Sequence, residues 1–549
     1  MNNIPHSETE LTAELPIRKN SHYPNASNTS YCTSMIHKKY ILILLILMTS
    51  FFTGCQSEKV YTSNWDSLAK HDPAPEWLED AKLGIYFHWG PYSVPAYMTE
   101  WYPRLMWFDS EKIGPFYGDN VFKHHEKTYG HPSKYPYHKF IPQFTGKHFD
   151  PSEWAELFEL AGAKFAGPVA EHHDGFSMWN SELTPWNAKD RGPKRDVLGE
   201  LFSSLKKRNL KTIATFHHAK NFQRHNSESY ETERKKYAFT DKSRRISFNS
   251  HFPYLEGHAT SSDDPELQKL YGNMPHDQWH EDMWLGKLEE VIDNYDPDIV
   301  WFDSWLDQIP ASYRQRFSAY YLNEAAKRNK NVAIIRKQND LPLDYTINDH
   351  EKSREPKALP ELWMTDDTLS TDSWSYTKDM KIKPVDMVLH SLIDTVSKNG
   401  VLLLNISPTS QGVIPDDQRN VLLKMGQWLK ESGKAIYSTR PWITAAEGPS
   451  TAPPPGLNNK DFFLNLKYSY KDIRYTMSKD KKTVYAISLG APPQNKKLIL
   501  TSPVSNNLKI KSITDIEGTP LDWRLINNSI SISPKKLNNL ATVYVINLI

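Results

Sequence analysis

The sequence predicts a (β/α) barrel, of the distorted (β/α)8 kind, followed by a C-terminal antiparallel β-sandwich. Between about residues 75 and 440, buried strand-like runs alternate with helical patterns, which is typical of a parallel sheet. Beyond residue 460, apolar and polar residues alternate in short segments, as in antiparallel strands with one buried face. Each strand expected in the first region also ends at polar residues that can carry out chemistry.

These strand ends favour a barrel over an open sheet. The active site of a (β/α) barrel gathers at the carboxyl ends of its strands. An open doubly wound sheet also binds ligands at strand ends, but no Gly-rich phosphate fingerprint follows the first expected strand. The expected strands lie at residues 84–87, 165–170, 211–216, 299–302, 332–335 and 401–404.

Helical periodicity separates these strands. The first long helix begins at Asp150, which precedes a proline as an N-cap does, and ends before Gly162. Further helices are expected around residues 198–205, 288–292, 320–326, 385–396 and 415–432.

Two stretches lack such patterns. Residues 219–283 are polar and have no clear period, so we expect a disordered segment or a functional loop over the site. Residues 443–459 contain several prolines and read as a linker. The expected organisation is therefore a catalytic barrel at 56–442, this linker, and a β-sandwich at 460–549.

Length and composition fit a large catalytic domain with an accessory one. The chain has 549 residues, more than one small domain needs. Its formal net charge of +1 gives no sign of nucleic-acid binding, so we expect no nucleic-acid partner. Aromatic residues make up 12%, and platforms for sugar rings are one use for them besides core packing. The two cysteines, Cys32 and Cys55, precede the barrel, which excludes a disulfide scaffold or cysteine-based metal site in the body of the protein.

The N-terminal region has the layout of a secretory signal. An apolar run from Tyr40 to Phe52 follows basic residues and is too short to span a bilayer comfortably. Small residues then lead into Cys55, which resembles the lipidated first residue of a bacterial lipoprotein. Met35 would give a signal of ordinary length, so the residues before it look like an over-extended start.

We therefore leave residues 1–55 out of the fold. We expect an exported protein, a periplasmic or outer-membrane lipoprotein of a bacterium, that meets the membrane only through a lipid anchor.

Asp303 is the first candidate catalytic residue. It follows the four apolar residues Ile299 to Phe302 and stands between Trp301 and Trp305. A carboxylate in apolar surroundings is costly unless it is paired or used, so a working carboxylate over a sugar-binding floor is one interpretation. A helix N-cap at an ordinary strand-to-loop junction is the other.

Histidines follow other strands. His88 ends the first strand, His172 and His173 follow the second, and His217 and His218 follow the third. A catalytic zinc would need more ligands than adjacent strand residues provide, and no His-Glu-x-x-His helix is present. Hydrogen bonds to sugar hydroxyls explain the histidines equally well, so we expect no metal and no cofactor.

Retaining glycoside hydrolysis needs two carboxyl groups, one ionised and one protonated. Asp303 fits the first role if a cation keeps it ionised, and Arg336 at the next strand end is the expected cation. Glu351 and Glu355 are the candidates for the acid, with Glu351 nearer to the expected strand. Either glutamate could instead be a solvated surface charge.

Five ordered motifs together resemble the α-L-fucosidases of glycoside hydrolase family 29. The similarity spans about residues 75–442, and any one motif alone would be weak. The motifs are Ala81 to Pro95, Glu100-Trp101-Tyr102, Glu171 to Phe176, Trp301-Phe302-Asp303 and Ser397 to Asn405.

The resemblance implies retaining hydrolysis of α-L-fucosides without a metal, so the expected partner is a fucosylated oligosaccharide or glycoconjugate. It places the nucleophile at Asp303 and the acid/base at Glu351. Arg336 matches a carboxylate-orienting arginine, and Trp374 would close the pocket over the methyl side of the sugar. The other implied substrate-binding residues are His88, Glu100, Trp101, His172, His173, His217 and Trp301.

The chain departs from the family pattern in three places. Ser304 stands where the family usually has glycine, and Thr215 to His218 replaces a common strand-end tyrosine. The loop at 219–283 is also longer than expected. These departures affect the aglycone, the linkage and the choice of sugar rather than the reaction type.

The sequence thus predicts an exo-acting retaining α-L-fucosidase. An α-L-galactosidase is a second enzyme hypothesis, since that sugar differs by one hydroxyl at C6. A non-catalytic lipoprotein that binds fucosylated glycans is a third, which the presence of both carboxyl groups disfavours.

Overall fold

The structure is a computed structural model that describes residues 60–108, 121–223, 250–451, 453–454 and 466–549. Cys55 and the predicted signal segment lie outside these residues. Among the helices that are described, none is long and apolar enough to cross a membrane.

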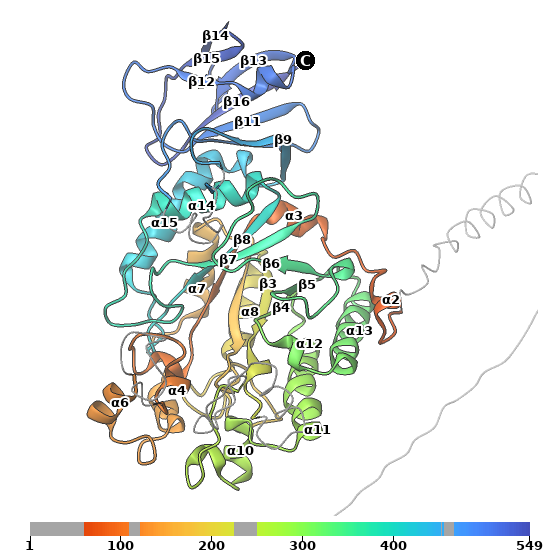
Figure 1. The fold of residues 1–549 in the computed structure, drawn as a ribbon, viewed down its shortest axis with the longest axis vertical. Helices are drawn as coiled ribbons and strands as arrows, with labels where there is room; N and C mark the ends of the chain where they lie inside the picture. The colour runs from red at the N-terminus through yellow and green to blue at the C-terminus, as the bar shows by residue number, and fades with distance from the viewer. Residues whose placement is uncertain (1–59, 109–120, 224–249, 452, 455–465) are drawn as a thin grey trace, which may run out of the picture. The chain divides into compact units, whose positions relative to one another are not determined.

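Eight parallel strands close into a barrel, in the order β1 to β8, with β8 pairing back to β1 (Figure 1). This arrangement confirms the predicted fold class. The strands are β1 (Leu83–Phe87), β2 (Phe165–Glu171), β3 (Lys211–Phe216), β4 (Ile299–Phe302), β5 (Ala333–Arg336), β6 (Ile347–Asp349), β7 (Trp363–Thr368) and β8 (Gly400–Ile406).

Strand β4 shows why these segments are apolar on both faces. Ile299 and Trp301 pack inside the barrel, whereas Val300 and Phe302 pack against the surrounding helices. Because successive side chains of a strand point to opposite faces, a strand covered on both sides reads as a continuous apolar run. Asp303 is the next residue on the inner face.

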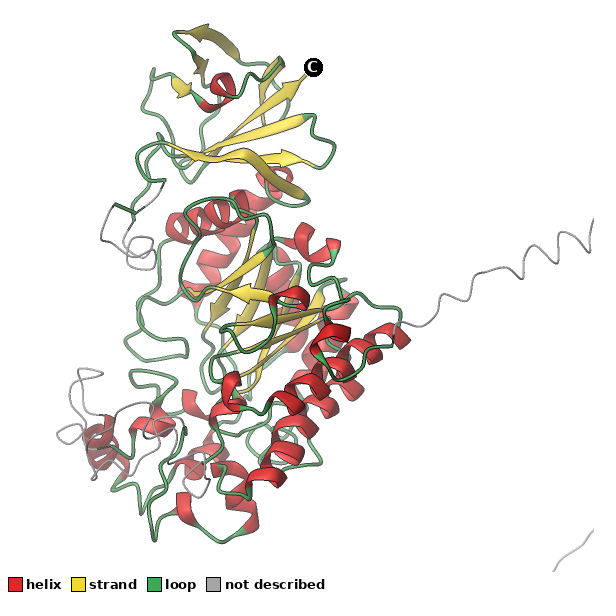
Figure 2. Cartoon of the chain, turned by 45° about the vertical axis from the view of Figure 1, so that its right-hand side comes forward, coloured by secondary structure: helices red, strands yellow, loops and turns green. Residues whose placement is uncertain are grey.

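Helices surround the strands (Figure 2). Helix α7 begins where predicted, since the Asp150 carboxylate accepts hydrogen bonds from the backbone amides of Ser152 and Glu153. The α-helices of the barrel region are α2 (Trp65–Leu68), α3 (Glu76–Ala81), α4 (Tyr102–Leu105), α6 (Val121–Tyr129), α7 (Pro151–Leu160), α8 (Val197–Lys207), α10 (Pro265–Tyr271), α11 (His276–Gln278), α12 (Lys287–Tyr295), α13 (Ala311–Lys327), α14 (Val385–Ser397) and α15 (Asp416–Ser432).

Shorter helical turns complete this region. A π-helix, η5 (Trp279–Gly286), precedes α12. The 3-10 turns are η1 (Pro91–Ser93), η2 (Tyr137–Gln143), η3 (His218–Lys220), η4 (Ala259–Ser261), η6 (Leu306–Gln308), η7 (Leu343–Tyr345) and η8 (Gly433–Ala435).

Two strands and several helices were not expected from the sequence. Strand β6 has only three residues, and β7 carries Thr365, Asp366 and Asp367, so neither shows the apolar run of a buried strand. The stretch 219–283 also differs from expectation, because its described part holds η3, η4, α10, α11 and part of η5. Residues 224–249 lie outside the described part of the chain.

Two antiparallel sheets follow the barrel, as predicted. One has the order β13-β16-β11-β10-β9 and the other β12-β15-β14, and side chains of both form one apolar core. The elements are β9 (Thr439–Glu447), β10 (Ile473–Ser478), β11 (Thr483–Ser488), β12 (Leu498–Leu500), α17 (Ser502–Ser505), β13 (Ile510–Asp515), β14 (Asp522–Ile526), β15 (Ser529–Ser533) and β16 (Thr542–Leu548).

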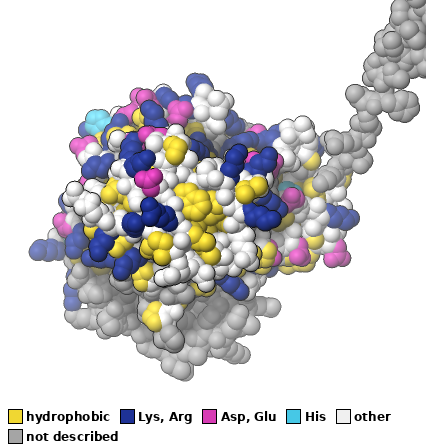
Figure 3. Space-filling model, turned by 90° about the horizontal axis from the view of Figure 1, so that it is seen from above, with side chains coloured by type: hydrophobic (Ala, Val, Ile, Leu, Met, Phe, Trp, Pro, Cys, Tyr) yellow, Lys and Arg dark blue, Asp and Glu magenta, His cyan; other side chains and the backbone are white. Residues whose placement is uncertain are grey.

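The larger sheet begins earlier than predicted. Strand β9 pairs with β10 from Thr439 onward, so residues 439–447 belong to this sheet rather than to the barrel and the linker. At the other edge, Leu525 and Ile526 on β14 are 64% and 46% exposed. Figure 3 shows hydrophobic side chains among lysine and arginine side chains on the face seen from above.

Candidate active site

The inward-facing side chains change from apolar to polar at the carboxyl ends of the barrel strands. Inside the barrel, Trp301 packs with Ile335, Ile347 and Leu403, among others. At seven of the eight strand ends, a residue at even spacing from these apolar residues points the same way and is polar. These residues are His88, His217, Asp303, Lys337, Asp349, Asp366 and Asn405.

Asp303 is held by three cationic or hydrogen-bonding groups. Its Oδ1 lies 3.2 Å from Nζ of Lys337, while its Oδ2 lies 3.3 Å from Nε2 of His173 and 3.4 Å from Nδ1 of His217. Burial alone would raise the pKa of this carboxyl. The Lys337 ammonium and the two imidazoles outweigh burial and hold the pKa of Asp303 well below its usual range. Asp303 is therefore ionised at neutral pH.

Lys337 joins Asp303 to two other carboxylates. Its Nζ lies 3.2 Å from Oδ1 of Asp303, 3.2 Å from Oε2 of Glu351 and 3.2 Å from Oδ2 of Asp366. Tyr86 donates a hydrogen bond of 2.9 Å to the same oxygen of Asp366. Burial would lower the pKa of Lys337, but the surrounding carboxylates raise it well above the ordinary value. A permanent cation thus stands between the two candidate catalytic carboxyl groups.

The expected cation was Arg336, and the structure corrects this assignment. Arg336 donates to the carbonyl of Gln338 at 2.8 Å and to the side chain of Asn339 at 3.2 Å, and neither of these hydrogen bonds involves Asp303. Ile335 faces the barrel interior, so Arg336 points outward and Lys337 points inward again. Because strand residues alternate between the two faces, Lys337 rather than Arg336 is the cation beside Asp303.

Glu351 and Glu355 occupy different surroundings. Glu351 reaches Lys337, and its side chain is 36% exposed. Glu355 instead lies 3.4 Å from Nε2 of His350. Of the two candidates for the acid, Glu351 is the one that the structure brings beside Asp303.

Asp349 and Asp366 form a second pair of carboxyl groups, close to Lys337. Asp349 is buried among Asp366, Lys337 and Glu351, and burial followed by the charge of Asp366 raises the pKa of Asp349 well above its ordinary value. Neither oxygen of Asp349 has a hydrogen-bond partner among the described residues. Because two buried carboxylates repel each other, Asp349 is the one that keeps a proton.

Three histidines gather beside this cluster. The ring centroids of His88, His172 and His217 lie 4.8 to 5.5 Å apart. Burial, followed by the neighbouring imidazoles, lowers the pKa of His172 well below 6.5, and burial and His217 do the same for His88. Burial also lowers the pKa of His173 to about 4. His88, His172 and His173 are therefore neutral at pH 7, and ring nitrogens of His88 and His172 can accept hydrogen bonds.

The predicted aromatic residues surround the same space. Trp301 is fully buried and packs against His217 at a centroid distance of 5.2 Å. The ring centroids of Trp374 and His88 lie 5.4 Å apart, and the backbone amide of Trp374 donates a hydrogen bond of 3.1 Å to the carboxylate of Glu100. Glu100 thus fixes the segment that carries Trp374.

A lysine sits between two further tryptophans at the entrance. Nζ of Lys220 lies 4.5 Å from the ring centre of Trp101 and 3.7 Å from that of Trp305. Trp101 also packs against His173 at 5.1 Å. Trp305 has a φ of 82°, an uncommon conformation for a bulky residue, and its amide donates to the side chain of Gln338 at 3.1 Å.

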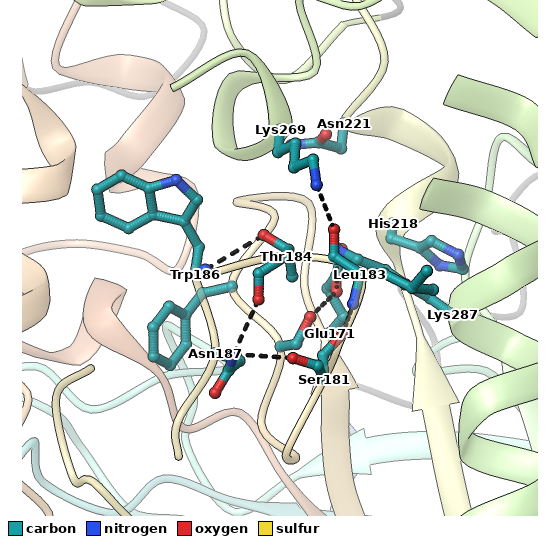
Figure 4. Close-up of polar contacts among 12 residues, drawn as sticks. Glu171, Ser181, Leu183, Thr184, Trp186, Asn187, His218, Asn221, Lys269 and Lys287 are labelled. Carbon is teal, nitrogen blue, oxygen red and sulfur yellow. Dashed lines mark hydrogen bonds and ion pairs between the residues drawn. The ribbon is translucent and has the colours of Figure 1, made fainter. Parts of the chain in front are cut away.

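The loop after β2 is fixed by polar contacts of its own (Figure 4). Nδ2 of Asn187 donates to the carbonyls of Ser181 and Thr184, and Nζ of Lys269 donates to that of Leu183. Glu171, at the end of β2, forms a buried ion pair of 2.7 Å with Lys287 instead of entering the pocket. These contacts anchor the segment that carries His172 and His173.

Sequence reasoning missed several pocket residues. Lys337, Asp366 and Asn405 lie at inward positions of their strands but were not singled out. The signal that could have found them is the two-residue alternation counted from the buried strand residues, for example from Leu403 to Asn405.

The arrangement supports acid–base and nucleophilic chemistry on a sugar. It combines an ionised carboxylate, a second carboxyl group and neutral imidazoles beside aromatic rings. Two sets of side chains offer three ligand atoms close enough to hold a metal ion among the described residues, namely His88 with His172 and His217, and His173 with His217 and Asp303.

The family model for alpha-L-fucosidase matches residues 49–434 of the chain. Among characterised proteins, the tissue alpha-L-fucosidase of Rattus norvegicus is 31% identical over 420 residues, which cover 74% of this chain and 78% of that one. The tissue alpha-L-fucosidase of Homo sapiens is 29% identical over 504 residues, covering 88% and 89%.

Solved structures show the same likeness. The crystal structure of Thermotoga maritima alpha-fucosidase in complex with fucose aligns with a TM-score of 0.65 and 25% identity, over 88% of this chain and 100% of that one.

Proposed function

The chain belongs to the alpha-L-fucosidase family, and from this premise we propose that Asp303 is the nucleophile and Glu351 the acid/base of a retaining α-L-fucosidase. The enzyme is a glycoside hydrolase that releases terminal α-L-fucose from glycans. Family membership does not favour the alternatives of an α-L-galactosidase or a non-catalytic glycan-binding protein.

The contact that carries the proposal is the shared cation. Because Asp303 and Glu351 each place an oxygen 3.2 Å from Nζ of Lys337, these oxygens are at most twice that distance apart, about 6.4 Å. Carboxyl groups that act on one glycosidic bond are about 5–9.5 Å apart, across retaining and inverting enzymes together. Asp303 and Glu351 therefore lie close enough to act on the same glycosidic bond.

The reaction takes two steps. The ionised carboxylate of Asp303 attacks the anomeric carbon, and the bond to the aglycone oxygen breaks as Glu351 gives that oxygen its proton. Glu351, now a carboxylate, then removes a proton from water. The water oxygen attacks the same carbon and releases Asp303 and fucose with its original configuration.

Neutral imidazoles suit the sugar-binding role. His88 and His172 can accept hydrogen bonds from hydroxyl groups because their rings carry no charge at pH 7. His173 instead contacts Asp303 through its Nε2. His217 adds a ring beside Asp303, and Glu100 positions Trp374. We propose that these residues, with Trp101 and Trp301, enclose one terminal sugar, which makes the enzyme exo-acting.

We propose that Trp374 makes the pocket prefer L-fucose to L-galactose. Its indole lies beside His88 and Tyr86, at centroid distances of 5.4 and 6.3 Å. An apolar ring stabilises the C6 methyl of fucose, whereas a C6 hydroxyl placed there would lose its hydrogen bonds to water. Aryl α-L-fucoside should therefore be a much better substrate than aryl α-L-galactoside.

The test is the variant Asp303→Ala, with Asp307→Ala as the control. Asp307 is an exposed aspartate four residues further along the chain. We expect Asp303→Ala to lower kcat on an aryl α-L-fucoside by roughly 10³-fold or more, with an unchanged circular dichroism spectrum, and Asp307→Ala to keep its activity. Normal turnover by Asp303→Ala would refute the assignment of the nucleophile.

We further propose that the enzyme is exported and lipid-anchored through Cys55. The support is the apolar run before this cysteine, a pattern typical of bacterial lipoprotein signals. Expression in a bacterium with a labelled fatty acid should label the wild-type chain and not Cys55→Ala. Equal labelling of both chains would contradict the anchor.

A further inference from the structure

We propose that His88, His172 and His217 bind one divalent transition-metal ion, represented here by Zn²⁺, and that the bound ion excludes the sugar. The binding of the ion follows from the three histidines alone. Its competition with the sugar rests on the proposed function.

The three side chains converge on one point. One ring nitrogen from each residue lies within 4.8 Å of the other two, and the residues are only 3%, 3% and 4% exposed. Zn–N bonds of about 2.0–2.1 Å in a tetrahedral site place ligand nitrogens about 3.4 Å apart. Small rotations of the rings therefore suffice to close the set around an ion.

Hydrogen bonds fix which nitrogen of His88 is free. Its Nδ1 lies 2.8 Å from Oδ1 of Asn405, which also accepts the backbone amide of His88 at 2.9 Å. The Asn405 amide nitrogen donates to Thr368 and to the carbonyl of Trp374, so its oxygen must face His88. Nδ1 of His88 therefore carries the proton and Nε2 keeps a lone pair.

His217 shows the same arrangement with a carboxylate. Its Nδ1 lies 3.4 Å from Oδ2 of Asp303, while its Nε2 is buried and has no hydrogen-bond partner among the described residues. Metal-binding histidines commonly donate one ring N–H to a carboxylate or carbonyl, which orients the other nitrogen toward the ion. Two of the three proposed ligands thus already have the supporting partners of a metal site.

His172 supplies the third nitrogen. Its Nδ1 is buried and has no hydrogen-bond partner among the described residues. The ring is held by Tyr92 and His173, at centroid distances of 5.0 and 4.5 Å. A buried nitrogen without a partner is unfavourable, so a ligand that binds it stabilises the pocket.

The chemistry of the donors selects the ion. Three imidazoles without a thiolate suit Zn²⁺, Cu²⁺ or Ni²⁺, whereas Mg²⁺ and Ca²⁺ prefer oxygen ligands. The fourth position remains open to water.

Sugar and metal need the same lone pairs. In the proposed function, His88 and His172 accept hydrogen bonds from hydroxyl groups of fucose through these nitrogens. An ion bound to them blocks those hydrogen bonds and occupies the space of the sugar. The two ligands are therefore mutually exclusive.

Calorimetric titration of the full chain with ZnCl2, after removal of metals by a chelator, tests the site. We expect one tight site in the wild type, and an affinity at least 10-fold lower in His172→Gln and in His88→Gln. The control is His276→Gln, because the exposed His276 lies 4.2 Å from the ring of His280 and forms a second candidate pair. Its tight site should persist, and loss of zinc binding only in His276→Gln would overturn the proposal.

A crystal of the wild type soaked in ZnCl2 gives a result that does not depend on the folding of a variant. The anomalous signal of zinc should lie between His88, His172 and His217. A pocket without this signal, at a zinc concentration that saturates the calorimetric site, would also overturn the proposal.

Competition is measured separately. L-fucose should weaken zinc binding, and zinc should raise KM for an aryl α-L-fucoside while kcat stays unchanged. Zinc binding in the pocket that L-fucose leaves unaffected would refute the competition. That result would not bear on Asp303 as the nucleophile, which the variant Asp303→Ala tests. The two proposals are therefore refuted by different results.

Discussion

Two charge clusters of this protein differ in how completely their buried polar atoms are paired. The pocket cluster, formed by Asp303, Lys337, Glu351 and Asp366, lies at the carboxyl ends of the barrel strands. The interface cluster, formed by Asp394, Lys398 and Arg474, joins helix α14 to strand β10 of the C-terminal sheet.

The interface cluster is fully paired. Asp394 accepts a hydrogen bond of 2.8 Å from Lys398 and another from Nε of Arg474. Arg474 also donates to the carbonyls of Ile473 and Ser450, at 3.0 and 2.8 Å. No side-chain nitrogen or oxygen of these three charged residues is both buried and without a partner.

The pocket cluster is surrounded by unpaired atoms. Buried atoms without a hydrogen-bond partner in the described part of the chain include Oδ1 of Asp366, both oxygens of Asp349, Nδ1 of His172 and Nε2 of His217. A structural cluster gains most when every group is paired, whereas a binding site has to keep groups available for a ligand. In the pocket, these unpaired atoms are available to a ligand, whereas the three charged groups of the interface cluster already pair with one another.

The largest effect is expected on stability, when a substitution breaks the interface cluster. Asp394→Ala leaves Lys398 and Arg474 buried without their carboxylate, so we expect a loss of about 3–5 kcal/mol in the free energy of unfolding. Urea unfolding measures this loss, and kcat at a temperature where the variant is folded should change little. Asp386→Ala, on the exposed first turn of the same helix, is the control and should cost less than about 1 kcal/mol. A large fall in kcat of folded Asp394→Ala would show that the interface cluster is not purely structural.

The next largest effect is expected on kcat/KM, when a substitution removes the cation of the pocket cluster. Lys337→Met should lower kcat/KM by about 10²- to 10³-fold, equivalent to about 3–4 kcal/mol. Without the ammonium, burial raises the pKa of Asp303, so the nucleophile is protonated at higher pH than before. The acidic limb of the pH–rate profile should therefore move to higher pH. Lys337→Arg keeps the charge and should restore part of the activity, and an unmoved acidic limb in Lys337→Met would contradict this role.

A smaller effect separates the two glutamates. Glu351→Ala should lower kcat by about 10²-fold on fucosides with poor leaving groups, and much less on an aryl fucoside that needs no acid. Added azide should restore turnover of the aryl substrate, because it replaces water as the nucleophile of the second step. Glu355→Ala is the matched control, and the same leaving-group dependence in that variant instead would assign the acid to Glu355.

A further expected effect is the response of stability to acid. Burial lowers the pKa of His125, His173 and His218 from 6.5 to about 4 in the folded barrel. In this window the unfolded chain binds more protons than the folded chain, so stability falls as pH decreases from 6.5 to about 4. Each histidine contributes at most about 1.4 kcal/mol per pH unit.

The interface cluster should resist the same change. The paired cations overcome the effect of burial and lower the pKa of Asp394 below 3.8, so its contribution is lost only below that pH. Thermal unfolding between pH 7 and 4.5 should therefore show a falling midpoint, with a smaller slope in His218→Phe and an unchanged slope in the control His131→Gln. Hydrogen exchange should rise first around His173 and His218, and a constant midpoint across this range would contradict the prediction.

Much of the site could be predicted from residues that stand in recognisable motifs. Asp303 follows a buried apolar run, and the histidine motifs follow other strands, so their place at one end of the barrel was predictable. Strands β6 and β7 were not predictable, because polar residues such as Asp366 interrupt their apolar pattern. Without β7, its inward carboxylate could not be assigned to the pocket.

By itself the sequence determined the order of strands and helices, the family resemblance and the place of Asp303 at a strand end. Only the tertiary structure decided that Lys337 and not Arg336 contacts Asp303, and that Glu351 and not Glu355 lies beside them. The physical reason is that the strand before Arg336 is apolar on both faces, so its residues carry no sign of which side faces the barrel interior. That choice is made when the eight strands pair and the barrel closes.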